Sequence, residues 1–156
     1  ALQGHDIGLI SEAGMPAVAD PGSSVVRAAH DLGLTVIPLV GPVSLLLALA
    51  ASGLNGQNFA FVGYLPQDAA ERAARLKQLE SLALKTGQTQ LWIETPYRNA
   101  AMLSALLQSL QANTRLAIAS GLTLASARIQ SHAVAQWKKG LKGPDGHTPA
   151  VYAIGP

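Results

Sequence analysis

Short apolar runs alternate with helix-like segments along the first part of the chain. The runs at residues 7–10 and 35–39 predict two strands, because each is brief and is followed by Gly or Pro. Residues 22–32 and 42–52 predict helices, and the second of these is apolar nearly all round, which is typical of a buried helix. Strands that alternate with helices favour a parallel sheet with right-handed crossovers. This part of the chain therefore predicts α/β architecture.

The segment that joins the first predicted strand to the first predicted helix reads LISEAGMPAVADPG, residues 9–22. Pro21 falls where the helix starts, and Asp20 is placed to cap it. Open α/β sheets bind ligands at the carboxyl ends of strands, and Gly14 would let a ligand approach the backbone because it has no Cβ. The same spacing also fits an ordinary turn, so spacing alone leaves both interpretations open.

The second part of the chain predicts another α/β region. Strands are expected at 59–62, 89–93 and 115–119, strand-like runs at 127–134 and 150–154, and helices at 68–84 and 97–111. Asp68 and Glu71 form a capping-box pair at the start of the first of these helices. The apolar face of the second consists of Leu103, Leu106, Leu107 and Leu110. Residues 141–149, LKGPDGHTP, have the composition of a flexible loop.

A domain boundary is expected after residue 56, where an apolar helix ends at Gly53 and an Asn-Gly turn signal follows. We predict a first domain within 1–56 and a second, with a mixed sheet, at 57–156. Two strands do not form an independently stable parallel sheet. The first domain is therefore expected to be incomplete, and the chain to be the C-terminal part of a longer protein.

Composition narrows the class of protein. The chain has 156 residues, 49% of them hydrophobic, which is enough to bury a core. It has no cysteine, which excludes disulfides and thiolate chemistry, and its four histidines show no metal-ligand spacing, so no metal is expected. We also expect no membrane span, because no apolar run approaches roughly 18 residues, and a cytoplasmic location is the default.

Charge is divided unevenly along the chain. Residues 1–56 carry one basic and four acidic side chains, whereas residues 57–156 carry ten basic and five acidic ones. The net charge of +2 is too small to indicate a nucleic-acid partner by itself. If a polyanion binds, the second part is expected to meet it.

Three separated motifs carry a resemblance to a known family: SEAGMPAVADPG with the following TVIPLVGPVSLLLAL, then FVGYLP at 61–66, then LWIETPYR at 91–98. Together they resemble the ribosomal RNA small subunit methyltransferase I family, a branch of the tetrapyrrole methylase superfamily. The resemblance covers most of the chain and fades after about residue 119. It implies two α/β domains, S-adenosylmethionine held in the cleft between them, and a homodimer.

The resemblance also implies which residues contact the cofactor, largely through backbone groups. They are Glu12, Ala13, Gly14 and Met15 in the first loop, Val43 and Ser44 after the Gly-Pro pair, Glu94 and Thr95 at the end of the WIET strand, and Pro149 and Ala150 near the C-terminus. No catalytic residue is assigned, because methyl transfer from a sulfonium depends mainly on positioning.

Several of these residues also have ordinary explanations. Ser44 and Thr95 could cap helices, and Met15 could fill a gap in packing. A carboxylate at Glu94, in a mostly apolar strand, could simply pair with Arg98.

Some basic residues outside this set could meet phosphates. Arg72 and Arg75 lie three residues apart on one predicted helix, where a solvated helix face is the expected role.

Departures from the family pattern concern the substrate more than the cofactor. Asp68 and Ala70 stand where the family carries lysines, a charged stretch is reduced to Ser-Gly-Leu-Thr-Leu at 120–124, and Pro149 replaces an acidic residue. A divergent paralogue is expected. Its acceptor could be a ribose 2′-hydroxyl of ribosomal RNA or a tetrapyrrole-like small molecule. The alternative is a non-catalytic RNA-binding or assembly module that keeps the fold.

Overall fold

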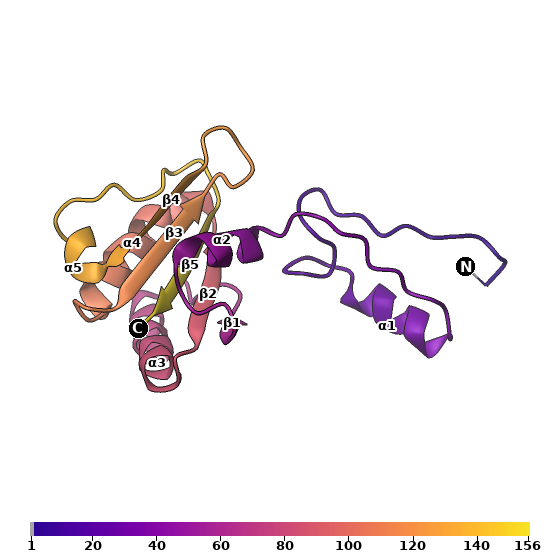
Figure 1. Cartoon of the computed structure of the whole chain (residues 1–156), viewed down its shortest axis with the longest axis horizontal. Helices are drawn as coiled ribbons and strands as arrows, with labels where there is room; N and C mark the ends of the chain where they lie inside the picture. Colours follow the sequence, from indigo (N-terminus) through magenta and orange to yellow (C-terminus); the bar gives the residue numbers. More distant parts are fainter. Residues whose placement is uncertain (1) are drawn as a thin grey trace. The chain divides into compact units, whose positions relative to one another are not determined.

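A computed structural model describes residues 2–156, and contacts divide them into two compact units on either side of residue 44. The unit before this point contains one complete helix, α1 (Ser23–Asp31), among turns and irregular chain (Figure 1). The unit after it contains nearly all the remaining helices and strands.

Gly22 determines how the chain turns into α1. Its φ of +140° is one that side chains rarely adopt, and an added Cβ would lie 2.9 Å from Leu9 Cδ2 and 3.2 Å from the backbone nitrogen of Ala17. Gly22 is also the N-cap residue of α1, and no side chain caps this helix. The expected cap from Asp20 is therefore wrong, because the helix begins after the glycine rather than at Pro21.

The strands predicted at 7–10 and 35–39 are not formed among residues 2–156. Their large apolar side chains are mostly exposed, with Ile10 at 87% and Leu39 at 80%. A strand exists only when a neighbour accepts and donates its ladder hydrogen bonds, and neither segment pairs with another within the described residues. The apolar pattern identified the segments but carried no information about a partner.

The second unit is built on a mixed five-stranded sheet with the order β1-β2-β5-β3-β4. The strands are β1 (Phe59–Phe61), β2 (Thr89–Glu94), β3 (Arg115–Ser120), β4 (Arg128–Ala133) and β5 (Ala150–Gly155). β1 and β2 are parallel, whereas the β2–β5, β5–β3 and β3–β4 pairs are antiparallel. The predicted strands of this unit are therefore formed, and the fold is α/β as expected.

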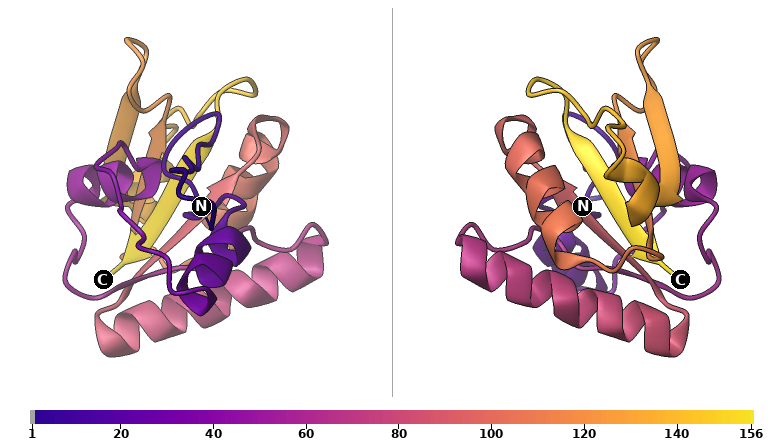
Figure 2. Two further views of the ribbon diagram at one scale, coloured as in Figure 1. Left: turned by 90° about the vertical axis from the view of Figure 1, so that its right-hand side faces the viewer. Right: turned by 90° about the vertical axis from the view of Figure 1, so that its left-hand side faces the viewer.

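Helices cover both faces of this sheet. The long helix α3 (Ala69–Thr86) and α4 (Asn99–Ser109) lie along one face, and α2 (Ser44–Ser52) lies along the other (Figure 2). The 3-10 turn η1 (Pro96–Arg98) leads into α4, and the short helix α5 (Val134–Trp137) follows β4. Contacts group α2 with this unit, whereas the sequence analysis assigns it to the first domain; the predicted boundary at residue 56 stays a prediction.

The core lies between the sheet and the α3–α4 layer. Trp92 of β2 and Tyr152 of β5 are Cα partners whose rings stack 5.8 Å apart, and both are fully buried. Leu106 and Leu110 are buried against them, and Leu103 and Leu107 pack partly buried, which confirms the predicted apolar face of α4. All six residues of β5 are buried, so both faces of this central strand are covered.

Asp68 caps α3 as predicted. Its Oδ1 accepts hydrogen bonds from the backbone N–H groups of Ala70 and Glu71, at 2.9 Å each. At the other end Gly87 adopts a left-handed conformation and donates to the carbonyl of Ala83, so both ends of this helix are satisfied.

Candidate functional site

Four of the candidate residues lie together at one end of the strands in the second unit, where β2 ends and β5 begins. Glu94, the last residue of β2, is the Cα partner of Ala150, the first residue of β5. Thr95 and Pro149 adjoin this pair along the chain. On its other side Ala150 pairs with Ser120, the last residue of β3, so three residues lie side by side at this end of β2, β5 and β3. Residues more than 50 positions apart along the chain are thus neighbours, as the resemblance implies.

Both oxygens of the Glu94 carboxylate face protein groups. Oε1 accepts hydrogen bonds from the Thr95 backbone N–H at 2.7 Å and from the Thr95 hydroxyl at 3.2 Å. Oε2 lies 3.1 Å from Nη2 of Arg98, and the Glu94 side chain is fully buried. The ordinary pairing of Glu94 with Arg98 is therefore present. The capping role for Thr95 is wrong, because its hydroxyl bonds to Glu94 and makes no cap at η1.

Arg98 also links the WIET strand to the FVGYLP segment. Its Nη2 donates to the carbonyls of Leu65 and Pro66 at 3.4 and 3.2 Å. From α3, Nη1 of Arg72 donates to the carbonyls of Pro66 and Gln67 at 3.3 and 2.8 Å. A guanidinium carries five N–H donors, so each arginine can donate hydrogen bonds to several backbone carbonyls that have no partner in the sheet. Two of the motifs behind the resemblance are thus joined by hydrogen bonds.

The solvated face expected for Arg72 is therefore wrong. The residue is 9% exposed, and its Nη1 donates to the carbonyls of Pro66 and Gln67 in the chain after β1. Periodicity placed Arg72 on a helix face correctly, but it could not show that unpaired carbonyls lie against that face.

Asn99 is a site residue that the sequence analysis did not find. Its Nδ2 donates to the carbonyls of Asp145 and Thr148 at 2.7 and 2.9 Å, and its Oδ1 accepts from the hydroxyl of Tyr152 at 3.0 Å. Asn99 is fully buried, so its amide fixes the loop that leads to Pro149. An asparagine at the start of a helix carries no sequence signal for partners 46 and 49 residues away.

Two ionisable groups beside Asn99 have shifted pKa values. Burial raises the pKa of the Tyr152 hydroxyl, and the nearby Glu94 carboxylate adds to the rise. The backbone N–H groups of His147 and Thr148 hold the pKa of Asp145 below its usual value. Tyr152 is therefore a neutral hydrogen-bond donor at ordinary pH, and Asp145 is charged.

The other candidate residues lie in the first unit, at residues 12–15 and 43–44. The hydroxyl of Ser11 bonds to the carbonyls of Ala13 and Gly14 at 3.2 and 3.3 Å and curls the loop. Gly14 has a φ of +76°, and a Cβ there would lie 3.9 Å from the carbonyl oxygen of Pro42. The first loop therefore lies beside the chain that leads to Val43, so the structure brings the candidates of this unit together.

Backbone N–H groups in this loop are available to a ligand. Within residues 2–156, those of Glu12, Ala13, Gly14 and Met15 donate to no backbone carbonyl. Unpaired N–H groups on a tight loop are suited to donate hydrogen bonds to an anionic or carbonyl oxygen.

Residues 2–156 contain no group of three or more His, Asp or Glu side chains that could hold a metal ion. None of the helices described is both long enough and apolar enough to cross a membrane.

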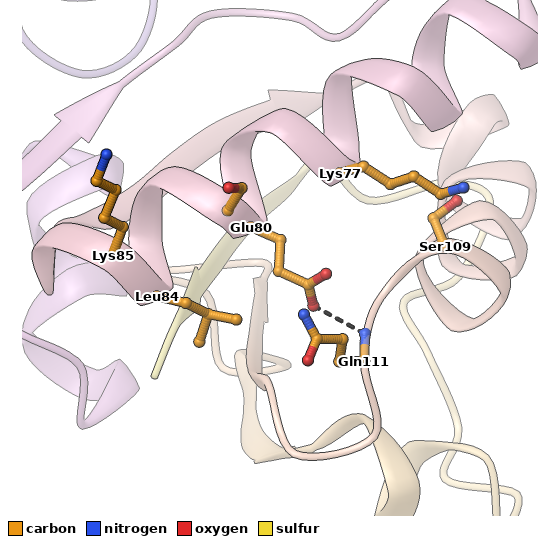
Figure 3. A pocket seen from close by; sticks show the side chains of 7 residues that line it. Lys77, Glu80, Leu84, Lys85, Ser109 and Gln111 are labelled. Atoms are coloured by element: carbon orange, nitrogen blue, oxygen red, sulfur yellow. Dashed lines mark hydrogen bonds between the residues drawn. The ribbon is translucent and has the colours of Figure 1, made fainter.

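A surface hollow of about 600 Å³ lies between α3 and the turn after α4 (Figure 3). Its Glu80 is buried and accepts hydrogen bonds from the Gln111 backbone N–H at 2.8 Å and from the Thr114 hydroxyl. None of the candidate residues lines it. Its carboxylate serves to hold the α4–β3 turn against α3, so this hollow is no part of the candidate site.

Comparison with known proteins identifies the family of the chain. A ribosomal RNA small subunit methyltransferase I from Mesorhizobium japonicum is 40% identical over 124 residues, which are 79% of this chain and 41% of that protein. The protein of the same name from Vibrio cholerae is 36% identical over 135 residues, 86% of this chain and 46% of that protein. The chain is homologous to ribosomal RNA small subunit methyltransferase I. It spans less than half the length of these relatives. No protein-family model matches it.

Solved structures place this homologue in the tetrapyrrole methylase fold. The methyltransferase CobJ superimposes with a TM-score of 0.56 at 17% identity, over 91% of this chain and 61% of that one. Uroporphyrin-III C-methyltransferase from Thermus thermophilus gives a TM-score of 0.51 at 20% identity, over 91% and 60%. At these identities the likeness concerns the fold alone.

Proposed function

We propose that this chain is part of an S-adenosylmethionine-dependent methyltransferase that acts on ribosomal RNA. The observation that carries the proposal is the 40% identity with a ribosomal RNA small subunit methyltransferase I across 79% of the chain. The resemblance of the three motifs suggests a ribose 2′-hydroxyl as the acceptor. It also suggests a homodimer, and a cytoplasmic location goes with the same proposal.

The residues present fit the cofactor in each unit. In the first, the N–H groups of residues 12–15 offer hydrogen bonds to the carboxylate of its methionine part, and Gly14 leaves room at the backbone. In the second, Glu94 and Ala150 are Cα partners, so Thr95 and Pro149, which adjoin them along the chain, lie at the same end of β2 and β5. When bound, S-adenosylmethionine supplies a methyl group on a sulfonium, which is transferred by in-line displacement.

Glu94 contributes to this site as a positioning residue. Its Oε1 accepts a hydrogen bond from the Thr95 backbone N–H and its Oε2 lies 3.1 Å from Arg98 Nη2, so the carboxylate holds the Thr95 backbone in place. Asn99 acts similarly on the other strand, because it fixes the carbonyl of Thr148 just before Pro149 and Ala150. Positioning of this kind suits a reaction that depends on orientation.

The proposal is tested by isothermal titration of S-adenosylhomocysteine into the chain and into a version extended to the full length of the relatives. Gly14→Trp is expected to abolish binding, because the indole fills the loop surface. Gly33→Trp is the matched control, since Gly33 has a similar φ of +67° but nothing within 4 Å of its Cβ position. Its affinity should be unchanged.

Absence of binding by both versions would contradict the transferase proposal and favour a non-catalytic module. Binding that Gly14→Trp leaves intact would show that the first loop does not contact the cofactor.

A further inference from the structure

A second hollow of about 270 Å³ lies at the same end of the sheet as Ala150, because its lining includes Ser120, the Cα partner of Ala150. It opens between the β3–β4 turn, residues 121–127, and the loop at 141–149, which both rise above the sheet in Figure 1. Its polar lining consists of Ser120, Ser126, Arg128, Lys142, Asp145 and Thr148. None of these residues belongs to the candidate cofactor set, so the hollow needs an explanation of its own.

The walls of the hollow are held in place by packing and hydrogen bonds. The buried amide of Asn99 bonds to the carbonyls on both sides of the loop tip. A Cβ at Gly143 would lie 2.5 Å from Leu103 Cδ2, so the loop backbone packs directly on α4. On the opposite wall, a Cβ at Gly121 would lie 3.4 Å from Thr148 Cγ2, which puts the turn against the loop. The hollow is therefore formed before any ligand arrives.

The charge in the hollow is positive. Within residues 2–156 the one ion pair joins Glu94 and Arg98, so Arg128 and Lys142 have no carboxylate partner. The single acidic residue, Asp145, is engaged by its own loop: Oδ1 accepts from two backbone N–H groups at 2.9 and 2.7 Å, and Oδ2 accepts from the Thr148 hydroxyl at 3.3 Å. Two free cations beside hydroxyl groups are the donor set that binds a phosphate.

We propose that this hollow binds a backbone phosphate of an RNA strand. The inference rests on the proposed function and adds to it the place where the acceptor strand is held. Ser120 of the hollow is the Cα partner of Ala150. A phosphate bound in the hollow would therefore lie close to Ala150, one of the proposed cofactor contacts. The volume is below that of a typical small-molecule site, which favours one phosphodiester group over a whole tetrapyrrole acceptor.

The hollow also agrees with how charge is distributed along the chain. The excess of basic over acidic residues lies in residues 57–156, and both cations of the hollow belong to that part.

The test compares two double variants of the chain that lose the same charge. Arg128→Ala with Lys142→Ala empties the hollow of cations, and Lys77→Ala with Lys85→Ala removes two lysines from the other hollow. Affinity for a fluorescein-labelled 20-nucleotide single-stranded RNA is measured by anisotropy at several salt concentrations. Circular dichroism checks that each variant is folded.

We expect the first double variant to bind RNA roughly tenfold more weakly or worse, because hydrogen bonds to charged groups are lost. Its plot of log affinity against log salt should become less steep by about 0.7 for each phosphate contact removed. In the control double variant, the change in this slope should be less than a third of the change in the first double variant. Equal losses in both variants, an unchanged affinity in the first, or no RNA binding by the unsubstituted chain would each overturn the proposal.

Titration of S-adenosylhomocysteine into the first double variant separates this proposal from the transferase proposal. Neither Arg128 nor Lys142 is in the cofactor set, so the cofactor affinity should not change. A protein that binds RNA through the hollow but binds no S-adenosylhomocysteine would refute the transferase function alone.

Discussion

Nη2 of Arg98 lies 3.1 Å from Oε2 of Glu94, and the Glu94 side chain has no exposure to solvent. The same guanidinium group donates to the carbonyls of Leu65 and Pro66, so one side chain joins the end of β2 to the segment after β1. Removing one partner of a buried ion pair leaves the other charge uncompensated, which is far more costly than losing a surface pair.

Arg98→Ala should therefore lower the free energy of unfolding by about 3–5 kcal/mol. Urea denaturation followed by circular dichroism measures this change. Arg75→Ala is the control, because Arg75 is partly exposed and reaches only Gln78, at 3.5 Å. Adding Glu94→Gln to Arg98→Ala should restore part of the loss, since a neutral amide needs no counter-charge. Equal midpoints for the Arg98 and Arg75 variants would contradict this account.

Gly22→Ala should destabilise the first unit more than Gly33→Ala. Both glycines have positive φ, so both variants suffer backbone strain, but only at Gly22 does the new Cβ meet other atoms, Leu9 Cδ2 and the backbone of Ala17. Hydrogen exchange of the α1 amides should be faster in Gly22→Ala than in Gly33→Ala by a factor of roughly ten or more. Similar exchange rates in the two variants would show that the neighbouring chain yields to the Cβ.

Asn99→Ala should free the loop at 141–149 and cost about 1–3 kcal/mol, because two partly buried hydrogen bonds to loop carbonyls and the buried one from the Tyr152 hydroxyl are lost. Tyr152→Phe removes only one of these three hydrogen bonds and should have a smaller effect. Hydrogen exchange in the loop separates the two variants. If the amide of Thr148 exchanges at the same rate in both variants, Asn99 does not fix the loop.

Asp145 should make the loop sensitive to acid. Its folded-state pKa lies below the usual value, so the stabilisation is present above the unfolded-state pKa, about 3.9, and is lost as the pH falls through the lower folded-state pKa. The amide resonances of His147 and Thr148 should titrate with a midpoint below that of an ordinary aspartate. In Asp145→Asn this titration should vanish, and a midpoint at or above the usual value would disprove the proposed cause.

The sequence predicted the second unit well because its strands and helices have the partners that their patterns require. β2, β3 and β5 lie side by side, so the buried faces that periodicity assigned to them are covered. The segments at 7–10 and 35–39 have equally apolar patterns but form no strand among the described residues. A pattern records which side chains need burial, and it does not record what covers them.

The candidate site was predictable in part for the same reason. The WIET motif located Glu94, the resemblance as a whole implied Ala150, and the register of β2 with β5 brings the two together. Arg72 and Asn99 were misjudged or missed because their partners are backbone carbonyls, which every residue type carries. Only tertiary structure shows which carbonyls lack a ladder partner.

We propose that S-adenosylmethionine contacts residues 12–15 and 43–44 of the first unit and residues 94–95 and 149–150 of the second. A two-dimensional ¹H–¹⁵N spectrum, recorded while S-adenosylhomocysteine is titrated into the labelled protein extended to the full length of the relatives, tests this assignment residue by residue. The amides of Gly14, Ser44, Thr95 and Ala150 are expected to shift saturably, while those of Lys77 and Lys85 stay fixed. Saturable shifts that leave out either set of residues, or that fall in the α3–α4 hollow, would refute the assignment.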